Sequence, residues 1–169
     1  IESNINKIID YMKHKPFDVV AFSAMSFMHN WILELAKNIK EQYGCKIVVG
    51  GPHATYFPEE SLQYADYVVI SEGFNSFRKI LKGEVKPGII HLTKLEKFPV
   101  ADRETFYQDY LEHKKSPIKS IITQTGCPYN CTYCYNSSSL EDIRYCLSPS
   151  QHAEMGQTLY PLGKLFPRS

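Results

Sequence analysis

Three cysteines lie close together in the second half of the sequence, at Cys127, Cys131 and Cys134. Their spacing, C-x3-C-x2-C, supplies three thiolates from one short loop and no fourth. A structural zinc site is usually closed by four nitrogen or sulfur ligands, and a four-iron cluster held by cysteines has one ligand position for each iron. Three thiolates therefore leave one position open, as in a catalytic metal site where a substrate or cofactor binds.

The spacing alone leaves other kinds of site open. A zinc knuckle is the main alternative, with His113 or Cys146 as a fourth ligand. A disulfide is a second alternative, although nothing in the sequence indicates the oxidising compartment in which disulfides persist. The metal is inferred from the ligand set, and an iron–sulfur cluster is the preferred interpretation.

The cysteine loop resembles that of radical S-adenosylmethionine (radical SAM) enzymes. In that family three cysteines at this spacing hold a [4Fe-4S] cluster, whose fourth iron binds S-adenosylmethionine. An aromatic residue commonly precedes the third cysteine, and Tyr133 occupies that place here. Residues 118–123 are rich in β-branched side chains and are predicted to form the strand that delivers the loop. The resemblance implies Cys127, Cys131 and Cys134 as cluster ligands and Tyr133 as a cofactor-binding residue.

The first half alternates between helical and strand patterns. Strands that alternate with helices imply an α/β fold with a parallel sheet. Gly44 is the expected end of the second helix, and Asn75 or Ser76 is the expected N-cap of the last one. The predicted elements are helices over about residues 3–14, 28–43, 58–64 and 75–82, and strands over 18–23, 46–50 and 66–71.

The predicted strands end in distinctive residues. Ligands of parallel α/β sheets bind at the carboxyl ends of the strands, and two adjacent glycines let a ligand approach the backbone closely. The known glycine-rich phosphate loops do not occur in the sequence. Taken alone, the Gly-Gly pair is better explained as a tight turn. The three segments are Ser23-Ala-Met25, Gly50-Gly-Pro-His-Ala-Thr55 and Ser71-Glu-Gly73.

Together these segments resemble the cobalamin-binding domain that is fused to some radical SAM enzymes. That domain carries a Ser-x-Leu-like element, then Gly-Gly often followed by Pro-His, then Gly-Glu-Gly-Glu-like residues. The third match is weaker, because Phe74 replaces the second Glu. The resemblance covers about residues 3–82 and 117–138. It implies a Rossmann-like (flavodoxin-like) domain whose cofactor-binding residues are Ser23, Met25, Gly50, Gly51, His53, Glu72 and Gly73.

His53 is placed by the resemblance near the corrin edge or the nucleotide tail, and a structural role is the alternative. The Asp-x-His-x-x-Gly run that binds cobalt in many cobalamin domains does not occur in the sequence. We expect its place to lie upstream of Ile1, because the chain has the pattern of a fragment of a longer enzyme.

Four segments are predicted along the chain. An N-terminally truncated cobalamin-binding domain spans residues 1–83, and an extended linker spans 84–116. The start of a radical SAM partial (β/α) barrel spans 117–147, and an unpatterned tail spans 148–169. Residues 95–103 resemble the linker of the family, with its Pro and Asp-Arg.

The composition argues against nucleic-acid binding and against a membrane-spanning segment. A net charge of +1 gives no general attraction to nucleic acid or to anionic membranes. No apolar run approaches the roughly 20 residues that span a bilayer. Cysteines in a metal-like array suit a reducing cytoplasm.

From these resemblances we predict that the chain is a fragment of a cobalamin-dependent radical SAM enzyme. The fragment alone is expected to be inactive. The resemblance implies three cofactors: a [4Fe-4S] cluster, S-adenosylmethionine and cobalamin. In the complete family these generate a 5′-deoxyadenosyl radical for methyl transfer or cyclisation at an unactivated carbon. A small-molecule substrate and an electron donor such as flavodoxin or ferredoxin are the implied partners. The alternatives are a zinc-binding module and a corrinoid carrier without radical chemistry.

Overall fold

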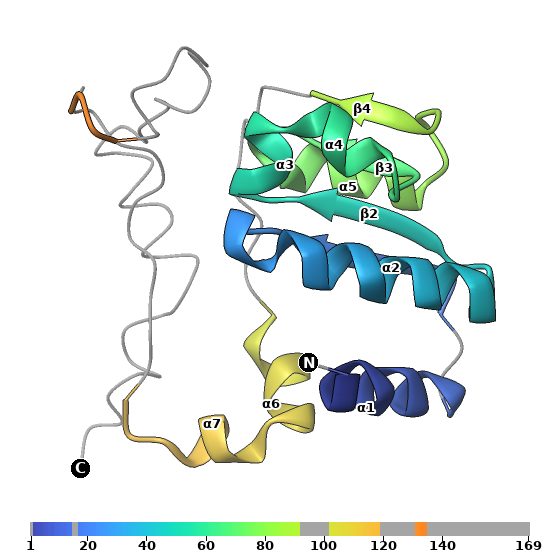
Figure 1. Ribbon diagram of the computed structural model, residues 1–169. Coiled ribbons are helices and arrows are strands. Elements are labelled where there is room, and N and C mark those ends of the chain that lie inside the picture. Colours follow the sequence, from blue (N-terminus) through green and yellow to red (C-terminus); the bar gives the residue numbers. More distant parts are fainter. Residues whose placement is uncertain (1, 15–16, 92–101, 119–130, 135–169) are drawn as a thin grey trace. The chain divides into compact units, whose positions relative to one another are not determined.

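The computed structural model of the 169-residue chain describes residues 2–14, 17–91, 102–118 and 131–134. The chain divides into two units, residues 1–95 and 96–169, and each is described by itself. The first unit contains a four-stranded sheet with helices (Figure 1). The described residues of the second unit form two short helices and a turn.

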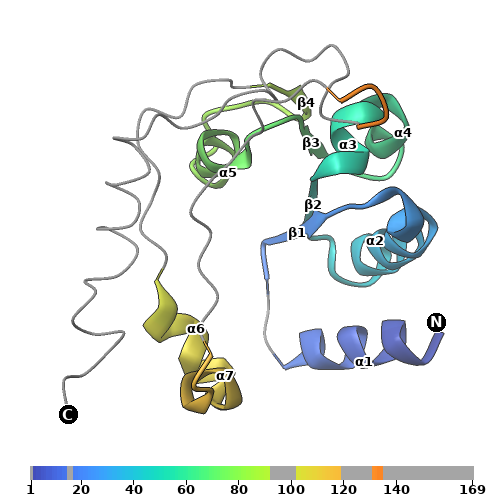
Figure 2. The same ribbon diagram turned by 90° about the vertical axis from the view of Figure 1, so that its left-hand side faces the viewer.

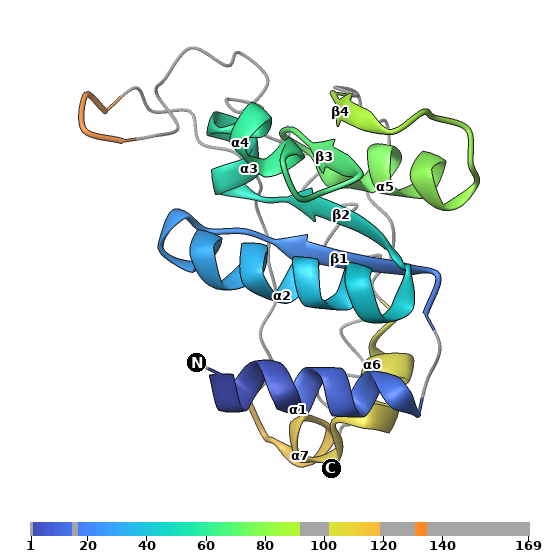
Figure 3. The same ribbon diagram turned by 45° about the vertical axis from the view of Figure 1, so that its right-hand side comes forward.

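Four parallel strands form the sheet, and their order in space is their order along the chain (Figure 3). Ser23 at the end of the first strand pairs with Gly50 at the end of the second. The segments that follow both strands therefore begin at one edge, which we call the carboxyl edge. The sheet confirms the predicted α/β fold class. The strands are β1 (Val19–Ser23), β2 (Lys46–Gly50), β3 (Tyr67–Val69) and β4 (Gly88–Ile90).

Helices cover both faces of this sheet. They are α1 (Glu2–Lys13), the 3-10 turn η1 (Ser26–Met28), α2 (His29–Tyr43), α3 (Pro52–Tyr56), α4 (Pro58–Leu62) and α5 (Gly73–Leu81). Figure 2 shows α2, α3 and α4 on one side of the sheet and α5 on the other. β1, β2 and β3 are each followed by a helical segment that returns the chain to the next parallel strand.

Alternate residues of the central strands point to opposite faces, as the two-residue period of a strand requires. In β2, Ile47 and Val49 belong to the larger core, with α1 and α2, whereas Val48 belongs to a smaller core with α5. In β3, Val68 and Val69 divide between the two cores in the same way. Burial on both faces explains why these strands are continuous apolar runs in the sequence.

The second helix shows how local sequence sets an element. Its apolar residues recur at helical spacing and form one buried face. Gly44 ends the helix with a φ of 64°, in the left-handed region that favours glycine. The predicted helix and its stop are confirmed. The buried apolar residues of α2 are Ile32, Leu35, Ala36 and Ile39.

The start of α5 differs from the prediction. Glu72 is the N-cap, and its carboxylate accepts a hydrogen bond of 2.9 Å from the backbone N–H of Gly73. The expected caps, Asn75 and Ser76, lie inside the helix, so that prediction was wrong. Helix α3 was not predicted, because its five residues are too few to show a periodic pattern.

The segment predicted as an extended linker, 84–116, is partly regular. Strand β4 continues the sheet beyond residue 83. Helices α6 (Arg103–Asp109) and α7 (Leu111–Lys115) follow. Asp102 caps α6 by accepting a hydrogen bond of 3.1 Å from the N–H of Thr105. The prediction of an extended linker did not take this side-chain cap into account. Of the strand predicted over 118–123, residues 119–123 lie outside the described residues.

Asp66 joins two elements of the first unit and gives a prediction for stability. Its carboxylate accepts hydrogen bonds from the Ile47 N–H (2.8 Å) and from the Lys40 ammonium (2.6 Å). Burial on its own raises the pKa of Asp66, but these hydrogen bonds and charges outweigh burial and lower the pKa below its usual value. The stabilisation is therefore present above the unfolded-state pKa and is lost as the pH falls through the folded-state pKa.

Asp66→Asn is expected to lower the free energy of unfolding at pH 7 by about 1–3 kcal/mol, because the charged acceptor is lost. The difference from wild type should begin to shrink below about pH 4, where the carboxylate of the unfolded chain becomes protonated, and it should keep shrinking as the pH falls through the lower folded-state pKa. Urea denaturation at pH 7 and pH 3.5 measures both effects. Asp10→Asn is the control, since its ion pair with Lys13 is exposed and is expected to change stability by less than about 1 kcal/mol. A pH-independent deficit in Asp66→Asn would contradict the account.

Candidate functional site

The ends of β1 and β2 are joined by backbone hydrogen bonds at the carboxyl edge. The N–H of Ala24 donates to the carbonyl of Gly50 (2.7 Å), and the N–H of His53 donates to the carbonyl of Ala24 (2.9 Å). The Ser23 and Gly50 segments, which the sequence placed at strand ends, are thus neighbours in space. These bonds hold the first residues after each strand in fixed positions.

Thr55 joins the end of β2 to the end of β3. Its hydroxyl donates to the carbonyl of Gly51 (2.9 Å) and accepts a hydrogen bond from the N–H of Ser71 (3.1 Å). Ser71 has a φ of 62°, a left-handed conformation that is uncommon for a residue other than glycine. The three predicted segments therefore form one hydrogen-bonded edge. The sequence did not indicate the bridging role of Thr55.

Gly51 has an intramolecular reason to be glycine. Its φ is 91°, and a Cβ at this position would lie 2.9 Å from both the backbone nitrogen of Ala24 and the Oγ of Ser23. The sequence alone favoured a tight turn at the two glycines, and the resemblance to cobalamin-binding domains implied that a ligand approaches the backbone here. The structure shows that the chain's own β1 loop makes the close approach, so the glycine fixes the shape of the edge.

Exposed apolar side chains occur in the segments that follow three strands. Phe27 in η1 is 85% exposed. Large exposed apolar surface marks ligand or partner sites. The exposed apolar residues nearest along the chain to the ends of β1, β2 and β3 are Met25, Phe27, Phe57 and Phe74. Of these, the sequence prediction named Met25 as a cofactor-binding residue.

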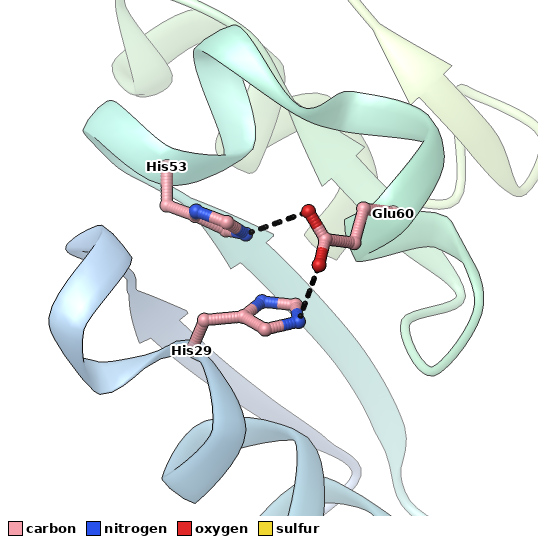
Figure 4. A group of neighbouring side chains, drawn as sticks. All are labelled: His29, His53 and Glu60. Atoms are coloured by element: carbon pink, nitrogen blue, oxygen red, sulfur yellow. Dashed lines mark ion pairs between the residues drawn. The ribbon is translucent and has the colours of Figure 1, made fainter.

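Two histidines and a glutamate form a cluster on α2, α3 and α4. Nε2 of His29 lies 3.1 Å from one carboxylate oxygen of Glu60, and Nε2 of His53 lies 3.7 Å from the other (Figure 4). Burial, followed by the neighbouring His29, lowers the pKa of His53, and Glu60 opposes this only in part. The lowered pKa favours the neutral form of the His53 ring. The predicted contact of His53 with the cofactor stays a prediction.

His29 and Glu60 were not among the residues predicted from the sequence. His29 is buried together with Ile32 and Ala36, which lie three and seven residues further along α2. A histidine at helical spacing with apolar residues was the available signal. No such signal in the sequence marked Glu60. This residue lies in the short helix α4, and its side chain is half exposed.

Part of the cysteine loop is described. The N–H of Cys134 donates to the carbonyl of Cys131 at 3.1 Å, which closes a tight turn, and both side chains are half-buried. The ring of Tyr133 is 91% exposed. Cys127 lies outside the described residues. The assignment of Cys127, Cys131 and Cys134 as cluster ligands therefore stays a prediction.

The first unit contains a region that matches a known protein family. Residues 1–81 match the family described as B12 binding domain. Residues 1–81 form a domain of the B12-binding family. The strand-end segments of this B12-binding domain are those that the resemblance to cobalamin-binding domains had indicated, with Ser71 at the position where that pattern has glycine. The left-handed φ of Ser71 explains why glycine suits this position.

Curated relatives extend beyond the B12-binding domain. An uncharacterized methyltransferase of Pyrococcus horikoshii is 27% identical and aligns with 82% of this chain and 35% of its own length. The bacteriochlorophyllide d C-8(2)-methyltransferase of Chlorobaculum tepidum is 24% identical over 70% of this chain and 28% of its own length. The hopanoid C-3 methylase of Methylococcus capsulatus is 26% identical over 79% of this chain and 30% of its own length. The chain thus spans about a third of these relatives.

No helix among the described residues combines the length and the apolar character that crossing a bilayer requires.

Proposed function

We propose that this chain is the cobalamin-binding part, with the start of the catalytic part, of a cobalamin-dependent methyltransferase of the radical SAM kind. The observation that carries the proposal is the order of two features in one chain. A B12-binding domain with a hydrogen-bonded carboxyl edge precedes the C-x3-C-x2-C loop. Three relatives that align with 82%, 70% and 79% of this chain are named as methyltransferases or a methylase.

The carboxyl edge fits a large, largely apolar macrocycle. Ligands of parallel α/β sheets bind at this edge, and here it presents exposed apolar side chains rather than a phosphate-binding loop. Met25 and Phe27 follow β1 directly, and Phe57 and Phe74 follow β2 and β3. We expect these side chains to bind the cofactor's apolar surface and to exclude water from it. The Ala24–Gly50 and Thr55–Ser71 hydrogen bonds hold the loops that present them.

In the proposed enzyme, cobalamin supplies a transferable methyl group and the cluster with S-adenosylmethionine supplies radical chemistry. Cys127, Cys131 and Cys134 would hold the cluster, and Tyr133 would lie beside it. The names of two relatives specify a carbon position that is methylated. We therefore propose a small-molecule substrate methylated at carbon, with flavodoxin or ferredoxin as the electron donor and a cytoplasmic location.

Phe27 gives the test of the cobalamin site. Phe27→Ala is expected to weaken cobalamin binding about 10- to 100-fold, because burial of a Phe side chain contributes about 1.5–3 kcal/mol. Titration of the purified chain with hydroxocobalamin, followed by absorbance after removal of unbound cofactor, measures the affinity. The matched control is Phe17→Ala, an exposed Phe just before β1 and so at the opposite end of the same strand. Equal losses in the two variants, or no loss in Phe27→Ala, would contradict the proposed site.

A further inference from the structure

The cluster of His29, His53 and Glu60 brings three potential metal ligands together from separate helices. Their ligand atoms all lie within 4.8 Å of one another. Figure 4 shows the two imidazole rings and the carboxylate turned toward one another. Both rings are buried, whereas the side chain of Glu60 is 49% exposed. The cluster therefore has buried nitrogen ligands and one side open toward solvent, past the glutamate.

His53 carries a polar atom without a hydrogen-bond partner. The residue is only 4% exposed, and its Nε2 has no hydrogen-bond partner although it is buried. The nearest oxygen of Glu60 is 3.7 Å away, beyond hydrogen-bonding distance. Buried polar side-chain atoms normally have a partner, and an exception calls for an explanation such as an unseen ion. This nitrogen points into the cluster (Figure 4).

The other nitrogen of each ring faces a hydroxyl group. Nδ1 of His53 lies 3.2 Å from Oγ of Ser26, and Nδ1 of His29 lies 3.4 Å from the hydroxyl of Tyr64. When each Nδ1–H donates to its hydroxyl, each Nε2 keeps a lone pair that faces the cluster. Hydrogen bonds of this kind orient histidines that bind metal ions.

An ion pair without a metal explains only part of this arrangement. An Nε2–H of His29 that donates to the carboxylate would account for the 3.1 Å contact with Glu60. It would leave Nε2 of His53 without a partner, beside a second ring whose centroid is 4.2 Å away. A cation shared by both Nε2 atoms and the carboxylate gives a partner to all three groups.

We propose that His29, His53 and Glu60 bind a divalent transition-metal ion of the zinc class through both Nε2 atoms and the Glu60 carboxylate. Two imidazoles and one carboxylate are an established zinc donor set that leaves a fourth position open. Metal–ligand bonds of about 2.0–2.1 Å place tetrahedral ligand atoms about 3.3 Å apart. Nε2 of His29 lies 3.1 Å from one carboxylate oxygen of Glu60, and Nε2 of His53 lies 3.7 Å from the other. These two distances lie on either side of the expected separation of ligand atoms.

The ion would fasten α2, α3 and α4 to one another beside the carboxyl edge. His29 begins α2, His53 lies in α3 and Glu60 lies in α4. These segments follow β1 and β2, so the ion would fix the loops that carry Phe27 and Phe57. The proposal depends neither on cobalamin nor on the cysteine loop.

Zinc binding is tested in the full chain with Cys127, Cys131 and Cys134 replaced by serine, because thiolates also bind zinc. Calorimetric titration of this variant with Zn²⁺ is expected to show one ion per chain. Adding Glu60→Gln should weaken binding at least about 100-fold, since even the loss of a group behind a ligand costs 10- to 100-fold. Glu59→Gln, the exposed neighbour in α4, is the matched control and should bind like the parent.

Two further readouts keep the outcome decisive. Co²⁺ in place of Zn²⁺ should give visible bands without thiolate charge-transfer absorption. Saturating Zn²⁺ should raise the melting temperature of the parent but not that of Glu60→Gln, while circular dichroism shows both folded. The proposal is overturned if the cysteine-free parent binds no zinc, if Glu60→Gln binds as tightly as Glu59→Gln, or if Co²⁺ shows thiolate bands.

Discussion

Replacing Cys134 with alanine is expected to abolish stable iron binding by this chain. After anaerobic reconstitution with iron and sulfide, the wild-type chain should hold about four irons, because each iron of a [4Fe-4S] cluster needs a ligand position. Cys127→Ala and Cys131→Ala should have the same effect, since three protein thiolates are the minimum for the proposed site. Iron and sulfide content, together with the optical spectrum, measures the loss.

The remaining cysteines are the controls for the cluster. Cys45 is buried, and burial, with Asp18 nearby, raises the pKa of its thiol. A protonated buried thiol is a poor metal ligand, so Cys45→Ala should keep its iron. Cys146→Ala should keep it as well. Equal loss on replacing Cys146 would indicate a fourth protein ligand and favour the zinc-knuckle interpretation.

Gly51→Val is expected to destabilise the whole first unit by roughly 2–5 kcal/mol. A left-handed backbone costs a non-glycine residue about 1–2 kcal/mol, and overpacking against fixed atoms adds about 1–3 kcal/mol. Both apply here, because φ is 91° and the new Cβ would lie 2.9 Å from backbone nitrogen of Ala24. Urea denaturation followed by circular dichroism measures the change.

Two other glycines separate these contributions. Gly44 has a φ of 64° with open space around a Cβ, so Gly44→Ala tests the backbone alone and should cost about 1–2 kcal/mol. At Gly50 a Cβ would meet Val69 at ordinary contact distances of 3.6 and 3.7 Å, so Gly50→Ala should cost less than about 1 kcal/mol. If Gly51→Val has the same urea midpoint of unfolding as the wild type, the close approach of Gly51 to the loop after β1 in this structure is contradicted.

The sequence predicted three of the four strands, and the signal was strongest for the central strands β2 and β3, which are buried on both faces. Runs such as residues 47–49 are apolar throughout and are bounded by breaks, which is a strong local signal. The end of α2 was predicted because Gly44 is a local signal too. Helices α3, α6 and α7 were missed because each has seven residues or fewer, and short helices show no period. The start of α6 depends on its side-chain cap, Asp102, whereas α3 and α7 begin without a side-chain cap.

The site was predictable in part for a similar reason. Strand ends are local, and parallel strands must bring Ser23 and Gly50 to one edge. What joins that edge is a set of contacts between residues far apart in the sequence. Thr55 reaches Ser71, and His29 reaches Glu60, and no spacing within one element encodes either pair. The reason for glycine at position 51 was likewise invisible until the β1 loop was seen beside it.

The central claim is that the carboxyl edge of the B12-binding domain binds cobalamin. Hydrogen–deuterium exchange of the full chain, with and without saturating hydroxocobalamin, tests it most directly. The account predicts slower exchange in residues 24–29, 51–57 and 71–74, which follow β1, β2 and β3. Residues 82–87, which precede β4 at the opposite edge, should exchange at an unchanged rate. Protection confined to residues 82–87, or no protection in the three strand-end segments, would contradict it.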